Sequence, residues 1–237
     1  MSRATNDVPA SFDAGARAYD GLVGANPGYN EHLRLSAERM NIPDRGRGLR
    51  LLDAGCGTGL STAALLAAAP EAEIIGVDGS AGMLTEARAK SWPSSVRFVH
   101  SYIENLAEAG VDGRFDGIFA AYLIRNVADK DAQLAAFLRL LRPGATLAIH
   151  EYSVRDDKIA AVTWNIVSTG IIIPFGRIRT GDAELYRYLR RSVNQFDGAN
   201  AFRKRLQDTG FVNVRSETMP GWQKNVVHTF LAEAPSA

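Results

Sequence analysis

The chain has 237 residues, of which 46% are apolar and 22% charged, so it is long enough to bury a sizeable core. Its formal net charge of +1 provides no overall field that would attract nucleic acid. The single cysteine, Cys56, excludes an internal disulfide framework, and four histidines without an HxxxH pair do not favour a zinc site. We find no signal-peptide pattern and no unbroken apolar run of roughly 18 residues, and therefore predict a cytoplasmic protein without a transmembrane segment.

Short apolar runs alternate with helical patterns, which is typical of a mostly parallel sheet covered by helices. A first helix is predicted at 29–40. The predicted strands that follow are 49–53, 73–78, 96–99, 115–121 and 145–151. The helices between them are predicted at 60–69, at 80–90 with Ser80 as the N-cap, and at 131–141, which Pro143 and Gly144 are expected to end.

The last third of the chain has a different pattern. Residues 158–173 look helical but irregular, and further helices are predicted at 183–193 and at 200–209, the second closed by Gly210. Two strand-like runs, 211–219 and 225–232, predict a terminal antiparallel pair. We interpret residues 1–237 as one domain, in which 1–45 and roughly 153–195 form helical lid or substrate elements.

The strongest motif is LLDAGCGTG at residues 51–59, a predicted strand that leads into a glycine turn and a helix. Glycines let the backbone turn sharply and approach a ligand, and open α/β sheets bind ligands beyond the carboxyl ends of their strands. The glycines alone also fit a dinucleotide site. Asp53 would repel a pyrophosphate but suits a cationic amino acid group, and Asp78 ends the next strand, where an acid can accept both ribose hydroxyls.

This motif, followed by GVDGSAGML at 76–84, resembles the signature of class I methyltransferases that use S-adenosylmethionine (SAM). The resemblance implies a Rossmann-like α/β fold with a seven-stranded, mostly parallel sheet of order 3-2-1-4-5-7-6 and helices on both faces. It implies SAM as the cofactor, with Asp53 near its ammonium group and Asp78 on its ribose. The other cofactor residues implied are Gly55, Cys56, Gly57 and Gly59 at the methionine part, Gly79, Met83 and Ile103 at the adenine, and Tyr19 stacked on the cofactor. At the adenine, either the backbone of Tyr102 and Ile103 or the side chain of Glu104 replaces the usual acid.

A closer resemblance is to the ubiquinone/menaquinone biosynthesis C-methyltransferases. The matching segments are Ala18-Tyr19-Asp20, Arg125-Asn126-Val127, and residues 140–144, 150–152, 186–192 and 206–211. Two segments depart from the family pattern: 153–180 matches loosely, and in 221–228 the histidine is displaced. The resemblance implies carbon methylation of a quinone-like or phenolic ring in a small hydrophobic molecule. O- or N-methylation of a small natural product, a SAM-binding cyclase or isomerase that transfers no methyl group, and NAD binding remain alternatives.

Carbon methylation of a phenolic ring requires the ring hydroxyl to lose its proton, which calls for a general base or a tuned hydrogen-bond donor. The candidates are Tyr122, Arg125 and Asn126, which follow the fourth strand, and Glu151 as a base at the end of the fifth. Arg125 has an alternative role as an ion-pair partner of Asp129 or Glu151. His150 alternates with its neighbours and is the one residue here that we expect to point away from the site.

The sequence also indicates which kinds of binding partner to expect. No NPPY-like element follows the fourth strand and no basic stripe is present, so we predict no nucleic-acid substrate. Apolar residues in 159–178 suit either a lid over a hydrophobic substrate or ordinary core packing. Beside them, Arg177, Arg179, Arg187, Arg190 and Arg191 suit either a peripheral contact with an anionic membrane or a solvated face. The sequence also leaves a homodimer open.

Overall fold

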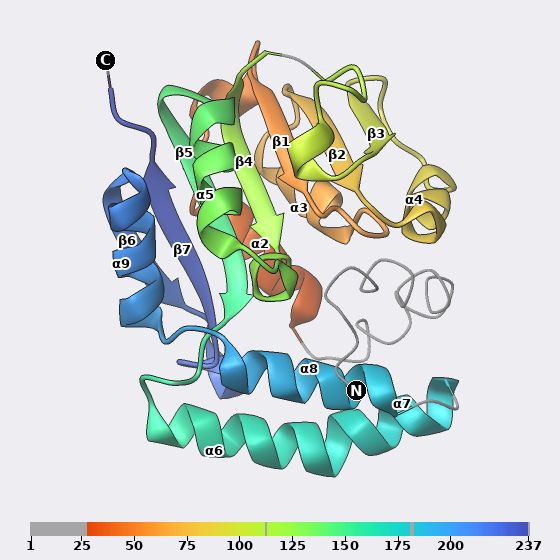
Figure 1. Ribbon diagram of the computed structural model, residues 1–237. Coiled ribbons are helices and arrows are strands. Elements are labelled where there is room, and N and C mark those ends of the chain that lie inside the picture. Colours follow the sequence, from red (N-terminus) through yellow and green to blue (C-terminus); the bar gives the residue numbers. More distant parts are fainter. Residues whose placement is uncertain (1–27, 112, 181–182, 237) are drawn as a thin grey trace.

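The computed structural model describes residues 28–111, 113–180 and 183–236. Seven strands form one sheet of order β3-β2-β1-β4-β5-β7-β6 (Figure 1). Their bounds are β1 Arg50–Ala54, β2 Glu73–Asp78, β3 Val96–His100, β4 Phe115–Ala121, β5 Leu141–Tyr152, β6 Val212–Thr218 and β7 Val227–Glu233. The pairs β5–β7 and β6–β7 are antiparallel and the others parallel, which confirms the predicted fold class and strand order.

Helices cover both faces of this sheet, and each face has its own apolar core. On one face, α5 and α9 bury Phe137 and Phe202 against the strands, and on the other α2 and α3 bury Leu33 and Leu65 (Figure 1). The helix bounds are α2 Tyr29–Glu38, α3 Leu60–Ala68, α4 Ala81–Arg88, α5 Lys130–Leu140, α6 Lys158–Val167, α7 Ile173–Thr180, α8 Glu184–Gln195 and α9 Ala199–Thr209. Short 3-10 turns lie at Pro43–Gly46 (η2), Ile103–Asn105 (η3), Ile124–Asn126 (η4) and Gly221–Gln223 (η6).

The start of β5 corrects one boundary. The sequence predicts that the helix runs to residue 141 and that Pro143 and Gly144 separate it from a strand at 145. Instead α5 ends at Leu140 and β5 begins at Leu141. Gly144 adopts a left-handed φ of 77° and donates its N–H to the Ala234 carbonyl, while the β4–β5 register shifts near Phe115. The irregularity is absorbed within the strand because glycine tolerates that backbone conformation.

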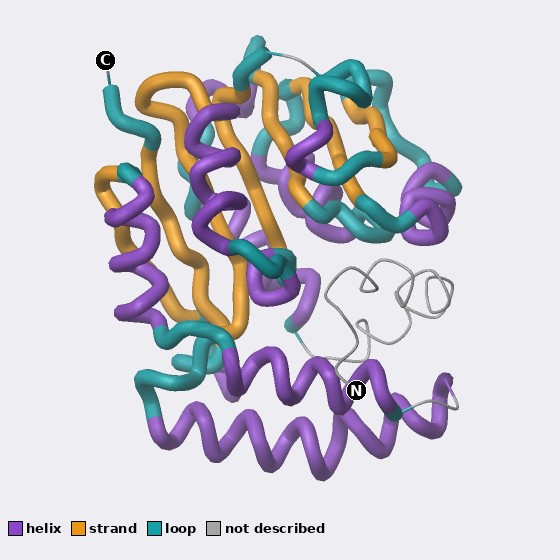
Figure 2. Tube along the Cα trace, viewed as in Figure 1, coloured by secondary structure: helices purple, strands orange, loops and turns teal. Residues whose placement is uncertain are grey.

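The irregular helix predicted at 158–173 continues to residue 180. A π-helical segment, η5 Ser168–Ile172, joins α6 to α7, so one long helix replaces the predicted shorter one. This helix and α8 lie side by side across the end of the sheet where β4 and β5 finish (Figure 2). By length and composition alone, Lys158–Ile178 could cross a membrane, with 22% of its most apolar window buried.

Candidate functional site

The glycine turn between β1 and α3 folds back onto the end of β2. The N–H groups of Gly55 and Cys56 both donate to the Val77 carbonyl, at 2.8 and 3.0 Å. Gly55, Gly57 and Gly59 have φ values of 71°, 55° and 87°, which L side chains rarely adopt. A Cβ on Gly57 would meet no atom within 4 Å, whereas a Cβ on Gly59 would lie 2.8 Å from the Trp92 ring. Gly57 therefore gives the backbone an open approach to a ligand, and Gly59 allows close packing.

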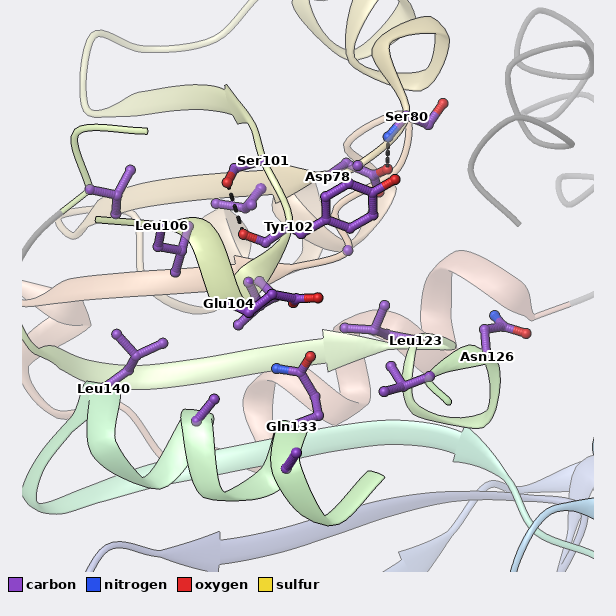
Figure 3. A pocket seen from close by; sticks show the side chains of 18 of the residues that line it. Asp78, Ser80, Ser101, Tyr102, Glu104, Leu106, Leu123, Asn126, Gln133 and Leu140 are labelled. Atoms are coloured by element: carbon purple, nitrogen blue, oxygen red, sulfur yellow. Dashed lines mark hydrogen bonds between the residues drawn. The ribbon is translucent and has the colours of Figure 1, made fainter. Parts of the chain in front are cut away.

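A cavity of about 1050 Å³ begins at this turn and runs along the carboxyl ends of β1, β2 and β4 (Figure 3). It brings together most of the residues predicted for the two halves of the site. The predicted cofactor residues that line it are Gly55, Gly57, Asp78, Gly79, Met83 and Ile103. The predicted catalytic residues that line it are Tyr122, Arg125 and Asn126. One cavity thus connects the glycine turn to the segment after β4.

Asp78 is held by the backbone around it. Its Oδ2 accepts the Gly57 N–H and its Oδ1 accepts the Ser80 N–H, each at 2.8 Å. Ser80 in turn caps α4, because its Oγ accepts the Met83 N–H at 3.1 Å, as the sequence predicts. Each carboxylate oxygen has a further lone pair, so the fixed carboxylate can still accept hydroxyl donors from the cavity.

Asp53 lies behind the turn, fully buried, and does not line the cavity. Its Oδ2 accepts the hydroxyls of Ser61 and Thr62 at 2.8 and 2.6 Å, but its Oδ1 has no hydrogen-bond partner. Burial raises the pKa of Asp53 to about 7, which the two hydroxyl hydrogen bonds counteract only in part. A buried carboxylate oxygen without a donor is costly. The predicted contact of Asp53 with a cofactor ammonium group stays a prediction, because Asp53 lies outside the cavity lining.

The remaining predicted cofactor residues are placed differently. Cys56 is buried, and its Sγ lies 3.1 Å from where a Cβ of Gly76 would be, so it packs against β2 instead of facing the cavity. Burial raises the pKa of its thiol well above the usual value. Gly59 also lies outside the cavity lining. Tyr19, with the Ala18-Tyr19-Asp20 motif, lies outside the described residues.

At the adenine end, the ring of Tyr102 lies over the backbone of Gly79. A Cβ on Gly79 would come within 2.9 Å of that ring, which itself is 49% exposed. Tyr102, Ile103 and Glu104 all line the cavity (Figure 3). Both alternatives for the adenine contact, the Tyr102–Ile103 backbone and the Glu104 carboxylate, are therefore within the same pocket.

Tyr122 organises the other half of the cavity. Its φ of 56° is unusual for a bulky residue, and its N–H donates to the His150 carbonyl at 2.8 Å. Its own carbonyl accepts Arg125 Nη1 at 2.8 Å and Asn126 Nδ2 at 3.1 Å. Its ring packs between those of Tyr29 and Tyr152, with centroids 5.6 and 5.0 Å away. The strained backbone thus aims one carbonyl at the two predicted polar neighbours.

Arg125 forms a buried ion pair with Glu151. Arg125 Nη1 lies 2.7 Å from Glu151 Oε1, and their side chains are 8% and 0% exposed. Glu151 also accepts the N–H groups of Tyr152 and Arg125, at 2.9 and 3.2 Å, and does not line the cavity. Asp129 instead caps α5. The structure therefore shows the ion pair that the sequence left as an alternative, and Glu151, predicted as a base, holds Arg125 in position.

His150 points away from the cavity, as expected, and connects Tyr122 to the helix α2. Its Nε2 lies 2.9 Å from Tyr122 Oη and its Nδ1 lies 2.7 Å from Ser36 Oγ. Ser36 Oγ is also hydrogen-bonded to Thr229 Oγ1, which accepts a further hydrogen bond from Arg39 Nη1 at 2.8 Å. Burial, with smaller repulsion from nearby cations, lowers the pKa of His150 to about 3, so the ring is neutral at physiological pH.

Two cavity neighbours were not singled out as site residues from the sequence. Gln133 lines the cavity from α5, and its buried Nε2 has no hydrogen-bond partner (Figure 3). The sequence does contain a signal for Gln133. It is a polar residue four positions before Phe137, and this spacing places it on the same buried side of the helix. Tyr188, on α8, does not line the cavity itself but donates its hydroxyl to Oδ1 of the lining residue Asn126 at 3.2 Å. Tyr188 lies in a family motif, but its contact with Asn126 depends on tertiary packing. Among the described residues, no group of three or more His, Cys, Asp or Glu could hold a metal ion.

This fold and this site define a SAM-dependent class I methyltransferase. The chain belongs to the ubiE/COQ5 methyltransferase family, whose family model matches residues 4–228. It is 35% identical over 183 residues to the ubiquinone/menaquinone biosynthesis C-methyltransferase UbiE of Bradyrhizobium diazoefficiens, covering 76% of this chain and 72% of the relative.

Solved structures share the fold at lower identity. Magnesium protoporphyrin IX methyltransferase (ChlM) from Synechocystis PCC 6803 with bound SAM has a TM-score of 0.67 and 16% identity, covering 100% of this chain and 99% of that one. The [4+2]-cyclase SpnF has a TM-score of 0.70 and 16% identity, covering 100% and 98%. The same fold therefore serves both a methyltransferase and a cyclase, so the reaction has to be argued from the site.

Proposed function

We propose that this methyltransferase transfers the SAM methyl group to a carbon of a quinone-like or phenolic ring in a small hydrophobic molecule. Membership of the ubiE/COQ5 family and the similarity to UbiE, a ubiquinone/menaquinone biosynthesis C-methyltransferase, support this substrate class. The observation that carries the proposal is the single cavity that joins the glycine turn and Asp78 to Tyr122, Arg125 and Asn126. Donor and acceptor can meet there, which is most of what this reaction requires of a protein.

The cofactor half of the cavity is suited to SAM. Asp78 would accept the ribose hydroxyls, and the open side of Gly57 would let the backbone approach the methionine part. Asp53 would supply its unpartnered Oδ1 to the ammonium group from behind the turn. Gly79 and Ile103, with Met83, would border the adenine. When bound, the cofactor supplies an electrophilic methyl group, and the chain orients it and keeps water away.

The acceptor half is suited to a phenolate. Glu151 is buried against Arg125, and of these two residues only Arg125 lines the cavity. A buried cation favours the deprotonated form of a phenolic hydroxyl, which sends electron density to the ring carbon. Asn126, fixed by Tyr122 and Tyr188, offers a second polar contact for orientation. We therefore assign Arg125 to phenolate stabilisation and Glu151 to positioning.

Helical segments lie around the acceptor half of the cavity. We propose that 153–195 act as a lid and substrate element of one domain, because α6 buries Trp164 against Tyr152, which packs on Tyr122. The same role for 1–45 stays a prediction, since residues 1–27 lie outside the described residues. A cytoplasmic location, a homodimer and the absence of a nucleic-acid substrate remain predictions. Light scattering on the purified protein measures the oligomeric state directly.

The deciding experiment is incubation with methyl-labelled SAM and a panel of quinols and phenols, followed by mass spectrometry. Label on a ring carbon supports the proposal. Label on oxygen or nitrogen assigns the protein to O- or N-methylation of a small natural product. SAM binding together with a rearranged but unmethylated product assigns it to the cyclase or isomerase class.

A further inference from the structure

One helix carries most of the exposed large apolar side chains of the described residues. The set is Ile159, Val162, Ile166, Ile171 and Ile178, which we call the apolar strip; they are 78, 58, 66, 63 and 82% exposed. Only Tyr102 and Val212 join them as exposed large apolar residues elsewhere in the described chain. Contiguous exposure of this kind marks an interaction surface, because isolated apolar residues scatter over a protein and do not gather on one helix.

The π-helical segment keeps the strip on one side of the helix. Val162 and Ile166 follow Ile159 by three and seven residues, which is ordinary α-helical spacing. Ile171 follows Ile166 by five, and in an uninterrupted α-helix that step would turn the side chain well away from its predecessor. Ser168–Ile172 is π-helical, so the wider turn returns Ile171 to the strip, and Ile178 follows two α-turns later.

The opposite side of the same helix is bound to the protein. Ala160, Trp164 and Ser168 are buried, and Asn165 hydrogen-bonds to both Asn194 and Arg190 of α8. In a transmembrane orientation, this packed and hydrogen-bonded side of the helix would lose its contacts with α8. In an in-plane orientation these contacts remain, and only the apolar strip meets an apolar medium.

Within the helix that carries the strip, all charged residues are basic. Residues 158–180 contain Lys158, Arg177 and Arg179 and no Asp or Glu, although Asp156 and Asp157 directly precede the helix and Asp182 follows it. On the neighbouring α8, Glu184 pairs with Arg187 at 3.0 Å and lies 4.0 Å from Arg191, while Arg190 borders a shallow hollow of about 560 Å³ beside Val162 and Ile166. A second copy placed on the strip would face this helix with the same cations, whereas an anionic lipid surface supplies the opposite charge.

We propose that the apolar strip docks the protein on an anionic lipid bilayer, with α6–η5–α7 lying in the plane of the headgroups. The helix is the outermost element on its side of the molecule, with α8 between it and the sheet (Figure 1). Its isoleucines enter the headgroup boundary, and the exposed Lys158 and Arg177 contact the anionic headgroups. The proposal does not depend on the identity of the methyl acceptor, because its readout is vesicle binding and not methyl transfer.

The test is co-sedimentation of the full chain with vesicles of phosphatidylcholine containing phosphatidylglycerol, and with pure phosphatidylcholine vesicles. We expect binding to the anionic vesicles that weakens with added salt. The double variant Ile166→Asp/Ile171→Asp should bind at least about tenfold more weakly, because two large apolar side chains are lost and two anions added. Val212→Asp, which changes an exposed apolar residue on β6, is the matched control and should bind as the parent protein does.

Two controls keep the outcome interpretable. Thermal melting and SAM binding should be unchanged in both variants, because all three positions are exposed and outside the cavity. Absence of vesicle binding by the parent protein, or equal binding by the double variant, overturns the proposal. A dimer in light scattering that the double variant abolishes, without vesicle binding, would instead assign the strip to contact between copies.

Discussion

The cofactor half and the acceptor half of the cavity are built in different ways. In the cofactor half, Asp78 and the Val77 carbonyl are tied to the glycine turn by backbone N–H groups, all within residues 55–80. In the acceptor half, side chains from distant elements are tied to one another: Arg125 to Glu151, and His150 to Ser36 of α2, 114 residues away in the sequence.

This difference has consequences for substitution. The two hydrogen bonds to the Val77 carbonyl join backbone groups and survive side-chain changes, so they hold the turn when a cofactor side chain is altered. A buried side-chain network leaves a charge or a donor without its partner when one member is removed. We therefore expect substitutions in the acceptor half to cost folding stability as well as activity, and substitutions in the cofactor half to cost mainly SAM affinity.

The largest expected effect is that of Arg125→Leu. It leaves the Glu151 carboxylate buried without its cation, which should lower the free energy of unfolding by about 3–5 kcal/mol, measured by urea denaturation at pH 7. The control is Arg142→Leu, which removes an ion pair to Asp116 whose arginine is 52% exposed, and should cost less than about 1 kcal/mol. Equal losses in the two variants would contradict the distinction between the halves.

The next effect is a pH dependence of opposite sign in the two halves. The pKa of His150 is about 3 when folded and 6.5 as a model value, so between these values the unfolded chain binds more protons and unfolding free energy rises with pH. The pKa of Asp53 is about 7 against a model value of 3.8, so in that window the folded protein binds more protons and unfolding free energy falls as pH rises. Each group contributes about 1.4 kcal/mol per pH unit.

Single variants separate the two contributions. Between about pH 4.5 and 6.5, His150→Gln should make the slope of unfolding free energy against pH more negative than in the parent protein, and Asp53→Asn should make it more positive. Over these two pH units each difference amounts to about 2.4 kcal/mol, because each group is partly titrated near the upper end of the interval. Denaturant titrations of all three proteins at several pH values measure it. Parallel curves would show that neither group titrates as its burial implies.

A smaller effect is expected for Asp78→Ala. The turn keeps its hydrogen bonds to the Val77 carbonyl but loses those that Asp78 accepts from the Gly57 and Ser80 N–H groups. Because the ribose hydroxyls also lose their acceptor, SAM binding should weaken by about 1–3 kcal/mol in calorimetry. Asp208→Ala, at an exposed position on α9, serves as the control and should bind SAM unchanged. Unchanged SAM affinity in a folded Asp78→Ala protein would remove Asp78 from the cofactor site.

The smallest effect is expected for Tyr122→Phe. The ring stack with Tyr29 and Tyr152 remains and the hydroxyl contact to His150 is lost, at a cost of about 1 kcal/mol in unfolding free energy. SAM affinity should not change. Tyr102→Phe, where the ring is about half exposed, should cost nothing measurable in stability. A loss of SAM affinity in Tyr122→Phe would show that Tyr122 belongs to the cofactor half as well as to the acceptor half.

The fold was largely predictable because it depends on short-range patterns. Alternating apolar runs and helical stripes located the strands and helices in chain order, and the Ser80 cap was readable from its position alone. The exceptions are places where a residue that often ends a helix or strand lies inside one, which the sequence pattern does not predict. Gly144 absorbs an irregularity inside β5 where the sequence suggested a break, and a π segment carries the α6 helix past Gly170 and Pro174.

The amino-acid sequence by itself determined the strands, the glycine turn and the two acids at strand ends, because each of these depends on residues that are close together in the chain. The sheet order followed from the family resemblance. Only the tertiary structure decided that Glu151 holds Arg125, that His150 joins Tyr122 to Ser36, and that five apolar side chains gather on one exposed side of a helix. The physical reason is distance along the chain: these contacts join residues whose proximity exists only once the sheet and its helices have packed.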